Sequence, residues 1–261
     1  MLYKTLIFEN KDGLGELTLN RPEAANSINV LMSEELLDVS IKCRHDQSLR
    51  ALLLTATGKM FSVGGDLGSF AKEGKNISNV LSYMTHQLHG AFFNFSSMRA
   101  PTVVAINGTA AGAGMSLACL CDISYAAESA KFTMAYTGAG LSPDGTSTYF
   151  LPRLIGVRKT KELMLTNRLL SSKEALDWGL VNDVFADDEV YESAKKLAIQ
   201  LSQGPTDAFG AVKSLLNESY QNSLPTQVEL EGMHIATLSS REDAQEGIAA
   251  FLEKRKPNFK G

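Results

Sequence analysis

Two glycine-rich segments of the chain could stabilise negative charge with backbone N–H groups. Residues 108–114 (GTAAGAG) follow a buried apolar run and precede the apolar helical run 115–120, which should leave free N–H groups at the start of a helix. Such a helix start can bind a phosphate or stabilise a developing oxyanion. Residues 61–67 (FSVGGDL) offer a second turn with paired glycines. Close helix packing accounts for the first segment equally well, and an ordinary loop for the second.

Asp144 is a carboxylate in a sequence that predicts a tight turn. Residues 142–145 (SPDG) have Pro at the second and Gly at the fourth position, as type I turns favour. Local sequence alone therefore predicts a solvated turn aspartate. His86 and His89 stand three residues apart on an expected helix, a spacing able to bind a metal. No carboxylate stands at a matching spacing, so we expect no metal site.

Strands and helices alternate in the first half of the chain and must position these residues. Residues 2–8 and 15–20 are predicted strands, joined at the turn signal Asp12-Gly13. The runs 51–55 (ALLLT) and 102–106 (TVVAI) are wholly apolar, which is typical of strands covered on both faces. This alternation predicts an α/β layered core. The expected core helices have apolar stripes at Met32, Leu36, Val39 and Cys43, after a cap at Asn29, and at Val80, Met84, Leu88, Ala91, Phe92 and Phe95.

Helical patterns fill almost all of the chain from about residue 145 onward. The amphipathic segments span about 187–203, 206–220, 224–238 and 241–254. No low-complexity linker separates the two halves. We predict an α/β core over residues 1–200 and a helical region over 201–261 that packs on a neighbouring subunit.

The 261 residues carry a net charge of −4, with a pI near 5.6. A chain with this balance has no global field for capturing nucleic acid or an anionic membrane, so we expect neither partner. No apolar run reaches the length of about 18 residues that a membrane helix needs, and the N-terminal segment lacks the features of a secretory signal. Cys43, Cys119 and Cys121 are odd in number and lie in apolar or helical patterns, which predicts a reducing, cytoplasmic compartment.

Four segments, in this order, resemble motifs of the crotonase superfamily, the enoyl-CoA hydratase/isomerase family. They are LNRPEAANS (19–27), FSVGGDL (61–67), the stretch from Ile106 to Asp122 with its NG-x-x-x-G-x-G pattern, and FLEKRKPNF (251–259). Each motif is weak alone, but four in register across the chain identify the fold and the ligand class. The resemblance implies an α/β fold, the ClpP-like spiral of ββα units, with a helical C-terminal trimerisation region.

The same resemblance implies an acyl-CoA thioester as the ligand, with coenzyme A as part of the substrate and no separate cofactor. Matched to the motifs, the N–H groups of Gly65 and Ala113 hold the thioester oxygen as it becomes an enolate oxyanion. The pantetheine arm is expected to pass Val63, Asp66 and Leu67. The implied assembly is a homotrimer or a hexamer built as a dimer of trimers.

Departures from the family pattern narrow the expected reaction. The two glutamates with which hydratases position water match Ser116 and Tyr136, so the carboxylate pair for adding water is missing. Residues 140–144 (GLSPD) resemble the G-L-x-P-[DE] segment of Δ3,Δ2-enoyl-CoA isomerases and of the phenylacetate-pathway isomerase. In those branches one carboxylate moves a proton between C2 and C4. The resemblance therefore makes Asp144 the catalytic acid/base of an enoyl-CoA isomerase.

Three other interpretations stay open: an enoyl-CoA hydratase, a 4-chlorobenzoyl-CoA dehalogenase and a catalytically silent acyl-CoA binder. The dehalogenases use an aspartate at this position as an aromatic-ring nucleophile, with a histidine that matches His89 and a tryptophan that matches Tyr136. Both side chains are therefore expected beside the substrate. Against a silent binder stands the intact Asp144.

Overall fold

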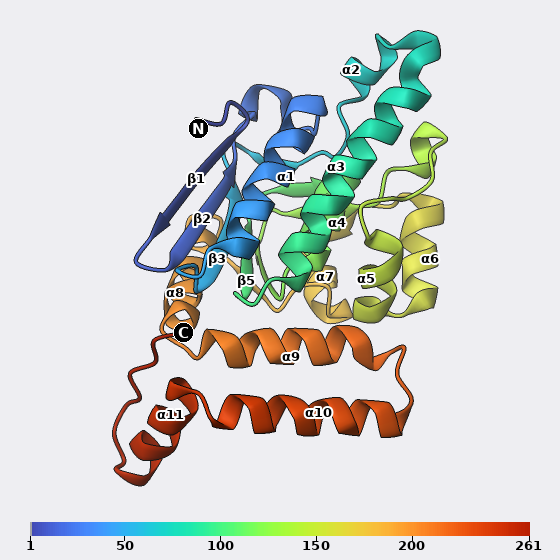
Figure 1. Cartoon of the computed structure of the whole chain (residues 1–261). Coiled ribbons are helices and arrows are strands. Elements are labelled where there is room, and N and C mark those ends of the chain that lie inside the picture. The colour runs from blue at the N-terminus through green and yellow to red at the C-terminus, as the bar shows by residue number, and fades with distance from the viewer. Residues whose placement is uncertain (1) are drawn as a thin grey trace.

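The structure, a computed structural model, describes residues 2–261 and arranges its strands in two sheets (Figure 1). The larger sheet has six strands in the order β1-β2-β3-β5-β7-β10, and the smaller has four in the order β4-β6-β8-β9. The strands of the larger sheet are Leu6–Lys11 (β1), Leu14–Leu19 (β2), Ala51–Ala56 (β3), Thr102–Ile106 (β5), Ile123–Ala127 (β7) and Asp183–Phe185 (β10). Those of the smaller sheet are Met60–Ser62 (β4), Thr109–Ala111 (β6), Lys131–Thr133 (β8) and Leu170–Ser171 (β9).

Successive strands alternate between the two sheets, and helices follow each pair. β3 leads to β4, β5 to β6 and β7 to β8, so each pair contributes one strand to either sheet. The contacts β3–β5 and β5–β7 are parallel, as are β4–β6 and β6–β8. Parallel neighbours need crossover connections, which the helices supply. The predicted α/β class with its repeated ββα unit is confirmed.

The helices α1 (Val30–His45) and α3 (Ile77–Ser97) pack against each other in front of the larger sheet (Figure 1). Asn29 begins α1 as predicted, because its side-chain oxygen accepts a hydrogen bond from the Met32 N–H at 2.9 Å. Both predicted apolar stripes are buried, except at Val80, which is partly exposed. The wholly apolar runs form β3 and β5, as predicted.

Shorter helices complete the core, and longer ones follow it. These are α2 (Leu67–Ala71), α4 (Ala113–Leu120), α5 (Ser147–Ile155), α6 (Val157–Thr166), α7 (Ser172–Trp178), α8 (Val190–Ser202), α9 (Thr206–Ser219), α10 (Leu224–Ser239) and α11 (Glu242–Leu252), with 3-10 turns at Pro22–Ala24, Gly74–Asn76 and Thr137–Ala139. The four amphipathic segments predicted after residue 186 are confirmed as α8 to α11. α8 packs on β3 and β5, whereas α10 packs on its helical neighbours, α9 and α11, and lies at the end of the molecule (Figure 1). In the part of the chain that the structure describes, no helix combines the length and the apolar character needed to cross a membrane.

Three local features differ from the sequence prediction. The first strand, predicted over residues 2–8, spans Leu6–Lys11, and the N–H groups of Lys4 and Thr5 donate to the Glu35 carboxylate at 2.8 and 2.9 Å. The mainly helical second half contains β10, which pairs in parallel with β7 at the edge of the larger sheet. The turn expected over residues 142–145 lies two residues later, where the Ser147 N–H donates to the Asp144 carbonyl oxygen at 3.2 Å. Its central residues, Gly145 and Thr146, have φ values of 59° and 66°. Contacts distant in sequence, described below, hold this turn.

Candidate active site

The backbone N–H of Gly65 points away from Ile28, the residue with which Gly65 forms a short β-bridge. In the short parallel bridge between Ile28 and Gly65, the Ile28 N–H donates to the Gly64 carbonyl oxygen at 2.7 Å, and the Asp66 N–H donates to the Ile28 carbonyl oxygen at 2.9 Å. Successive N–H groups of an extended segment point to opposite sides, so the N–H of Gly65 faces away from Ile28. Within residues 2–261 it has no acceptor.

Ala113 contributes a second free N–H, because it is the first residue of α4 and the first N–H groups of a helix have no acceptor within it. The loops that hold Gly65 and Ala113 touch through glycines. A Cβ on Gly64 would lie 2.8 Å from the carbonyl oxygen of Ala111 and 3.1 Å from the nitrogen of Ala113. Gly64 also has a φ of 87°. Both the lack of space for a Cβ and the backbone conformation therefore require glycine at this position. The two predicted donors therefore lie on adjoining loops.

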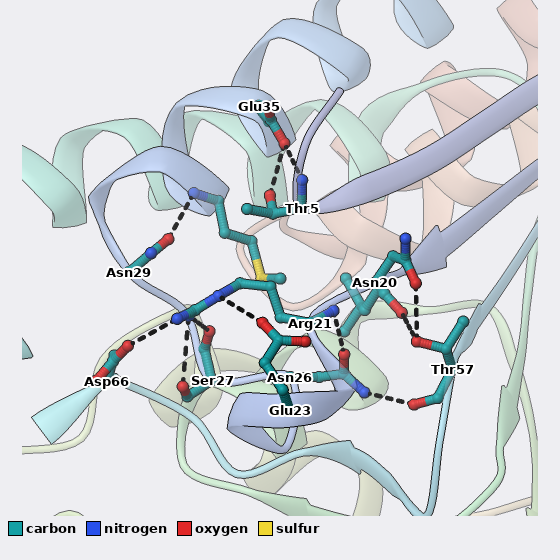
Figure 2. A network of polar contacts seen from close by, with 12 residues as sticks. Thr5, Asn20, Arg21, Glu23, Asn26, Ser27, Asn29, Glu35, Thr57 and Asp66 are labelled. Atoms are coloured by element: carbon teal, nitrogen blue, oxygen red, sulfur yellow. Dashed lines mark hydrogen bonds and ion pairs between the residues drawn. The ribbon is translucent and has the colours of Figure 1, made fainter. Parts of the chain in front are cut away.

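A polar network anchors the Gly65 segment from the N-terminal side of the chain (Figure 2). Arg21 donates to the Ser27 carbonyl oxygen at 2.6 Å and pairs with the Asp66 carboxylate at 3.1 Å. Asp66 also caps α2 by accepting from the Ser69 N–H at 3.0 Å. Partial burial raises the pKa of Asp66, but the hydrogen bonds from Ser69 and the Arg21 guanidinium outweigh this effect and hold that pKa below its usual range. The carboxylate predicted to meet the pantetheine arm is thus engaged within the protein.

Asn26 links the same segment to the adjacent strand. It is fully buried, and its amide donates to the Thr57 carbonyl oxygen at 2.8 Å (Figure 2). The same amide donates to the Met60 carbonyl oxygen at 2.8 Å. The Ser62 hydroxyl donates to the Asn26 carbonyl oxygen at 2.8 Å and accepts the Gly64 N–H at 3.2 Å. Hydrogen bonds therefore run without interruption from Asn26 to the residue that precedes Gly65.

A cavity of about 380 Å³ lies beside the two free N–H groups. Its lining includes Gly65 and Ala113, one face of the first half of α3, and residues of the segment 135–144. Among the lining residues that the structure describes, Asp144 is the one carboxylate. The large aliphatic and phenyl side chains of the lining are Ile28, Val63, Leu67, Phe70, Leu81, Met84, Leu88 and Leu141. A larger hollow of about 1030 Å³ among α9, α10 and α11 contains neither free N–H group nor Asp144, so we assign the site to the smaller cavity.

The Asp144 carboxylate is held by a tyrosine. The Tyr136 hydroxyl donates to Asp144 Oδ1 at 2.7 Å. The buried Ser116 places its Oγ 3.3 Å from that hydroxyl and 3.2 Å from the Asp144 carbonyl oxygen. Burial raises the pKa of Tyr136, and the charge of Asp144 raises it further, so the phenol keeps its proton near neutral pH.

His89 contacts the turn that follows Asp144. The Gly145 N–H donates to His89 Nε2 at 3.1 Å, which makes Nε2 an acceptor and assigns the ring proton to Nδ1. Nε2 also lies 3.6 Å from Asp144 Oδ2. Because its lone pair already accepts the Gly145 N–H, this nitrogen offers no proton to the carboxylate, and the short separation is not an ion pair.

The structure brings most of the predicted site residues around one cavity. Its lining contains Gly65, Ala113, Asp144, Tyr136, Val63 and Leu67, while His89 contacts the Asp144 turn and Asp66 faces Arg21. Val63 and Leu67 are 38% and 55% exposed, which suits the entrance of the cavity. No group of three or more His, Cys, Asp and Glu side chains is gathered as a metal site would need anywhere in residues 2–261.

The sequence model of the family described as Enoyl-CoA hydratase/isomerase matches residues 9–261. The chain belongs to this family. It is 38% identical over 261 residues to a Rhodobacter capsulatus protein named "probable enoyl-CoA hydratase", covering 100% of both chains. It is 36% identical over 250 residues to the 1,2-epoxyphenylacetyl-CoA isomerase of Escherichia coli, covering 95% of each. Among solved structures, an enoyl-CoA hydratase from Polaromonas sp. JS666 superposes with a TM-score of 0.92 at 30% identity, covering 98% of this chain and 99% of that one.

Membership of the enoyl-CoA hydratase/isomerase family confirms the predicted superfamily, the crotonase fold and an acyl-CoA thioester as the class of substrate. The names of the relatives include both hydratases and an isomerase, so the family alone does not select the reaction. Sequence reasoning missed the parts of Arg21 and Asn26 in holding Gly65, and the contact between Tyr136 and Asp144. The motif at residues 19–27 contained a signal for the roles of Arg21 and Asn26, because a turn after a strand does not require so many polar residues.

Proposed function

We propose that this protein is an enoyl-CoA isomerase that moves a double bond from C3 to C2 of an acyl-CoA thioester. One observation carries the proposal: Asp144 lines the same cavity as Gly65 and Ala113, whose N–H groups are free. A single base beside two donors for the thioester oxygen is sufficient for a 1,3-proton shift, because the intermediate keeps its negative charge on that oxygen.

The reaction begins when the Asp144 carboxylate removes a proton from C2. The C2–H electron pair forms a C1=C2 bond, and the carbonyl pair moves onto the oxygen between Gly65 and Ala113. Each donor contributes about 3 kcal/mol to stabilising this dienolate. Asp144 then gives the proton to C4, where the C3=C4 electron pair forms the new C4–H bond. The C1=C2 pair moves to make the C2=C3 bond, and the electron pair on the oxygen re-forms the carbonyl. One proton leaves the substrate and one returns, so no water or other reactant is consumed.

The surroundings of Asp144 support isomerisation over hydration. Addition of water needs a general base for the water and an acid for the substrate carbon, which a pair of carboxylates can provide. Here Asp144 is joined by the hydroxyls of Ser116 and Tyr136, and the raised pKa of Tyr136 keeps that group from acting as a base. Among the described lining residues, the cavity therefore has one carboxylate and lacks the carboxylate pair.

The contact of His89 weighs against the dehalogenase alternative. A dehalogenase would use Asp144 as a nucleophile and a nearby base to release the aryl ester with water. The ring nitrogen of His89 that is nearest to Asp144 already accepts the Gly145 N–H at 3.1 Å. This arrangement favours a structural contact of His89 over an activated base.

Replacement of Asp144 by Asn tests the proposal. Conversion of 3-hexenoyl-CoA to 2-hexenoyl-CoA should fall by about 10²–10⁴-fold, the usual loss when a general base is removed. Binding of the ester, followed by thermal shift, should persist because main-chain groups hold the oxygen. The matched control is Asp177→Asn on the exposed side of α7, which should keep full activity.

The alternatives predict different results with the same variants. Efficient hydration of crotonyl-CoA that survives in Asp144→Asn would refute the assignment. Chloride release from 4-chlorobenzoyl-CoA that depends on both Asp144 and His89 would identify a dehalogenase. Saturable ester binding without turnover of any of the three esters would identify a silent acyl-CoA binder.

We also propose a homotrimer or a hexamer as the assembly, located in the cytoplasm. α10 buries none of its side chains within the chain, and α9 to α11 leave large apolar side chains such as Leu216, Ile235 and Ile248 more than half exposed. A second copy would cover this surface. The three cysteines are free thiols, which agrees with a reducing compartment.

A further inference from the structure

We propose that Tyr136 is a positioning residue for Asp144, which holds one carboxylate oxygen so that the other carries the proton between C2 and C4. This inference rests on the proposed isomerase function and specifies how its base is held. Oδ1 accepts the Tyr136 hydroxyl at 2.7 Å, and Oδ2 has no hydrogen-bond donor among the described residues. His89 Nε2 lies 3.6 Å from Oδ2, and that nitrogen already accepts the Gly145 N–H. Oδ2 is therefore the oxygen available to the substrate.

The backbone around Tyr136 sets the direction of its side chain. The Tyr136 N–H donates to the Met134 carbonyl oxygen at 2.7 Å. Its carbonyl oxygen accepts the N–H groups of Ala139 and Leu141 at 3.0 Å each, which closes the loop that leads to Asp144. On the far side of the hydroxyl, Ser116 of α4 lies 3.3 Å away. The phenol is thus held from both ends, and it can fix the rotation of a carboxylate that would otherwise turn freely about its terminal bond.

The strength of the hydrogen bond between Tyr136 and Asp144 depends on whether the Asp144 carboxyl is ionised. Burial and the charge of Asp144 raise the pKa of Tyr136, so its hydroxyl remains the donor across the neutral range. A hydrogen bond to an ionised carboxylate is stronger than one to a neutral acid. The contact from Tyr136 is therefore strongest to the ionised carboxylate, the form that removes the proton from C2.

The first test is Tyr136→Phe, which removes the hydroxyl and keeps the ring. We expect kcat for 3-hexenoyl-CoA to fall about 10- to 100-fold, while KM stays within about threefold, because the lost contact is to the base and not to the ester. The matched control is Tyr149→Phe. Its hydroxyl donates to the Asn217 carbonyl oxygen at 3.0 Å, so that variant loses the same atom and a structural hydrogen bond, with kcat unchanged.

A second comparison separates positioning from a general structural effect. In the Asp144→Asn background, Tyr136→Phe should reduce the remaining rate less than about twofold, because no base is left to hold. An equal loss in both backgrounds, or full kcat in Tyr136→Phe, would overturn the proposal.

Exchange of the C2 protons of hexanoyl-CoA with D₂O distinguishes this inference from the proposed function. This probe needs only proton removal beside the thioester and no double bond. Exchange by the unmodified protein that falls in both Asp144→Asn and Tyr136→Phe supports the positioning role even if no isomerisation occurs. Exchange that depends on Asp144 alone overturns the role of Tyr136. Absence of both exchange and isomerisation in the unmodified protein overturns the two proposals together.

Discussion

Replacement of Gly64 by Ala should disable the oxyanion site and leave the fold intact. The added Cβ would lie 2.8 Å from the Ala111 carbonyl oxygen and 3.1 Å from the Ala113 nitrogen, whereas ordinary contacts begin at 3.4 Å. The two loops must therefore separate by about 0.6 Å at the closer contact. The donors of such a site act within a range of only about 0.4 Å, so this shift should remove one of the two hydrogen bonds to the thioester oxygen. We expect kcat to fall about 10²–10³-fold.

The control for this variant is Gly179→Ala at the end of α7. Gly179 has a φ of 76°, close to the 87° of Gly64, but its added Cβ would meet nothing nearer than 3.8 Å. Each variant should lose about 1 kcal/mol of unfolding free energy from backbone strain, and Gly64→Ala about 1–3 kcal/mol more from crowding, as measured by urea denaturation. Only Gly64→Ala should lose activity. A folded Gly64→Ala protein with kcat within about threefold of the unmodified value would refute the reasoning.

Three shorter predictions concern stability and assembly. The pKa of Asp66 in the folded protein is held below its ordinary value of 3.8. The ionised carboxylate therefore stabilises the fold fully above pH 3.8, and this stabilisation is lost as the pH falls through the lowered pKa of the folded protein. Asp66→Asn should make the unfolding free energy depend less on pH in this acid range. Lys213 Nζ lies 2.8 Å from the Asp122 carboxylate, and the lysine side chain is 8% exposed. Lys213→Ala should therefore lower the unfolding free energy, measured by urea denaturation, by about 3 kcal/mol. Lys195→Ala, at the more exposed ion pair with Glu16, should lower it by less than about 1 kcal/mol. Light scattering at micromolar concentration should give three or six times the chain mass of 28.2 kDa, and a stable monomer would contradict the proposed assembly.

Periodic patterns made most of the fold predictable. The stripe from Met32 to Cys43 specifies one buried helix face, and the apolar runs of β3 and β5 specify strands covered on both sides. Asn29 was recognisable as a cap because its type and its place before an apolar stripe are both local properties. Such features depend on residues within one or two turns of each other. The glycines of the site were predictable for a similar reason, since they follow buried strands.

Features held by distant contacts were not predictable in this way. The three residues of β10 are too few for a periodic signal, and they form a strand because β7 offers a free edge. The turn at Asp144 was predicted two residues early from its Pro and Gly. In the structure Gly145 donates to His89, 56 residues away in sequence, and a Cβ on Gly145 would lie 3.0 Å from Phe92. These contacts stabilise a turn with Thr146 at a φ of 66°, which costs a β-branched residue about 1–3 kcal/mol and which local propensity disfavours.

The ligand class and the reaction depend on different parts of this site. In the proposed function, the N–H groups of Gly65 and Ala113 hold the thioester oxygen, and main-chain donors persist when neighbouring side chains change. We propose that the choice of reaction depends on Ser116, Tyr136 and Asp144, which come from α4 and two positions of one loop. A change in these three side chains alters the number of bases without disturbing the oxyanion site. This proposal agrees with the hydratase and isomerase names among relatives of similar identity. In this chain the group 2.7 Å from the Asp144 carboxylate is the Tyr136 hydroxyl and not a second carboxylate.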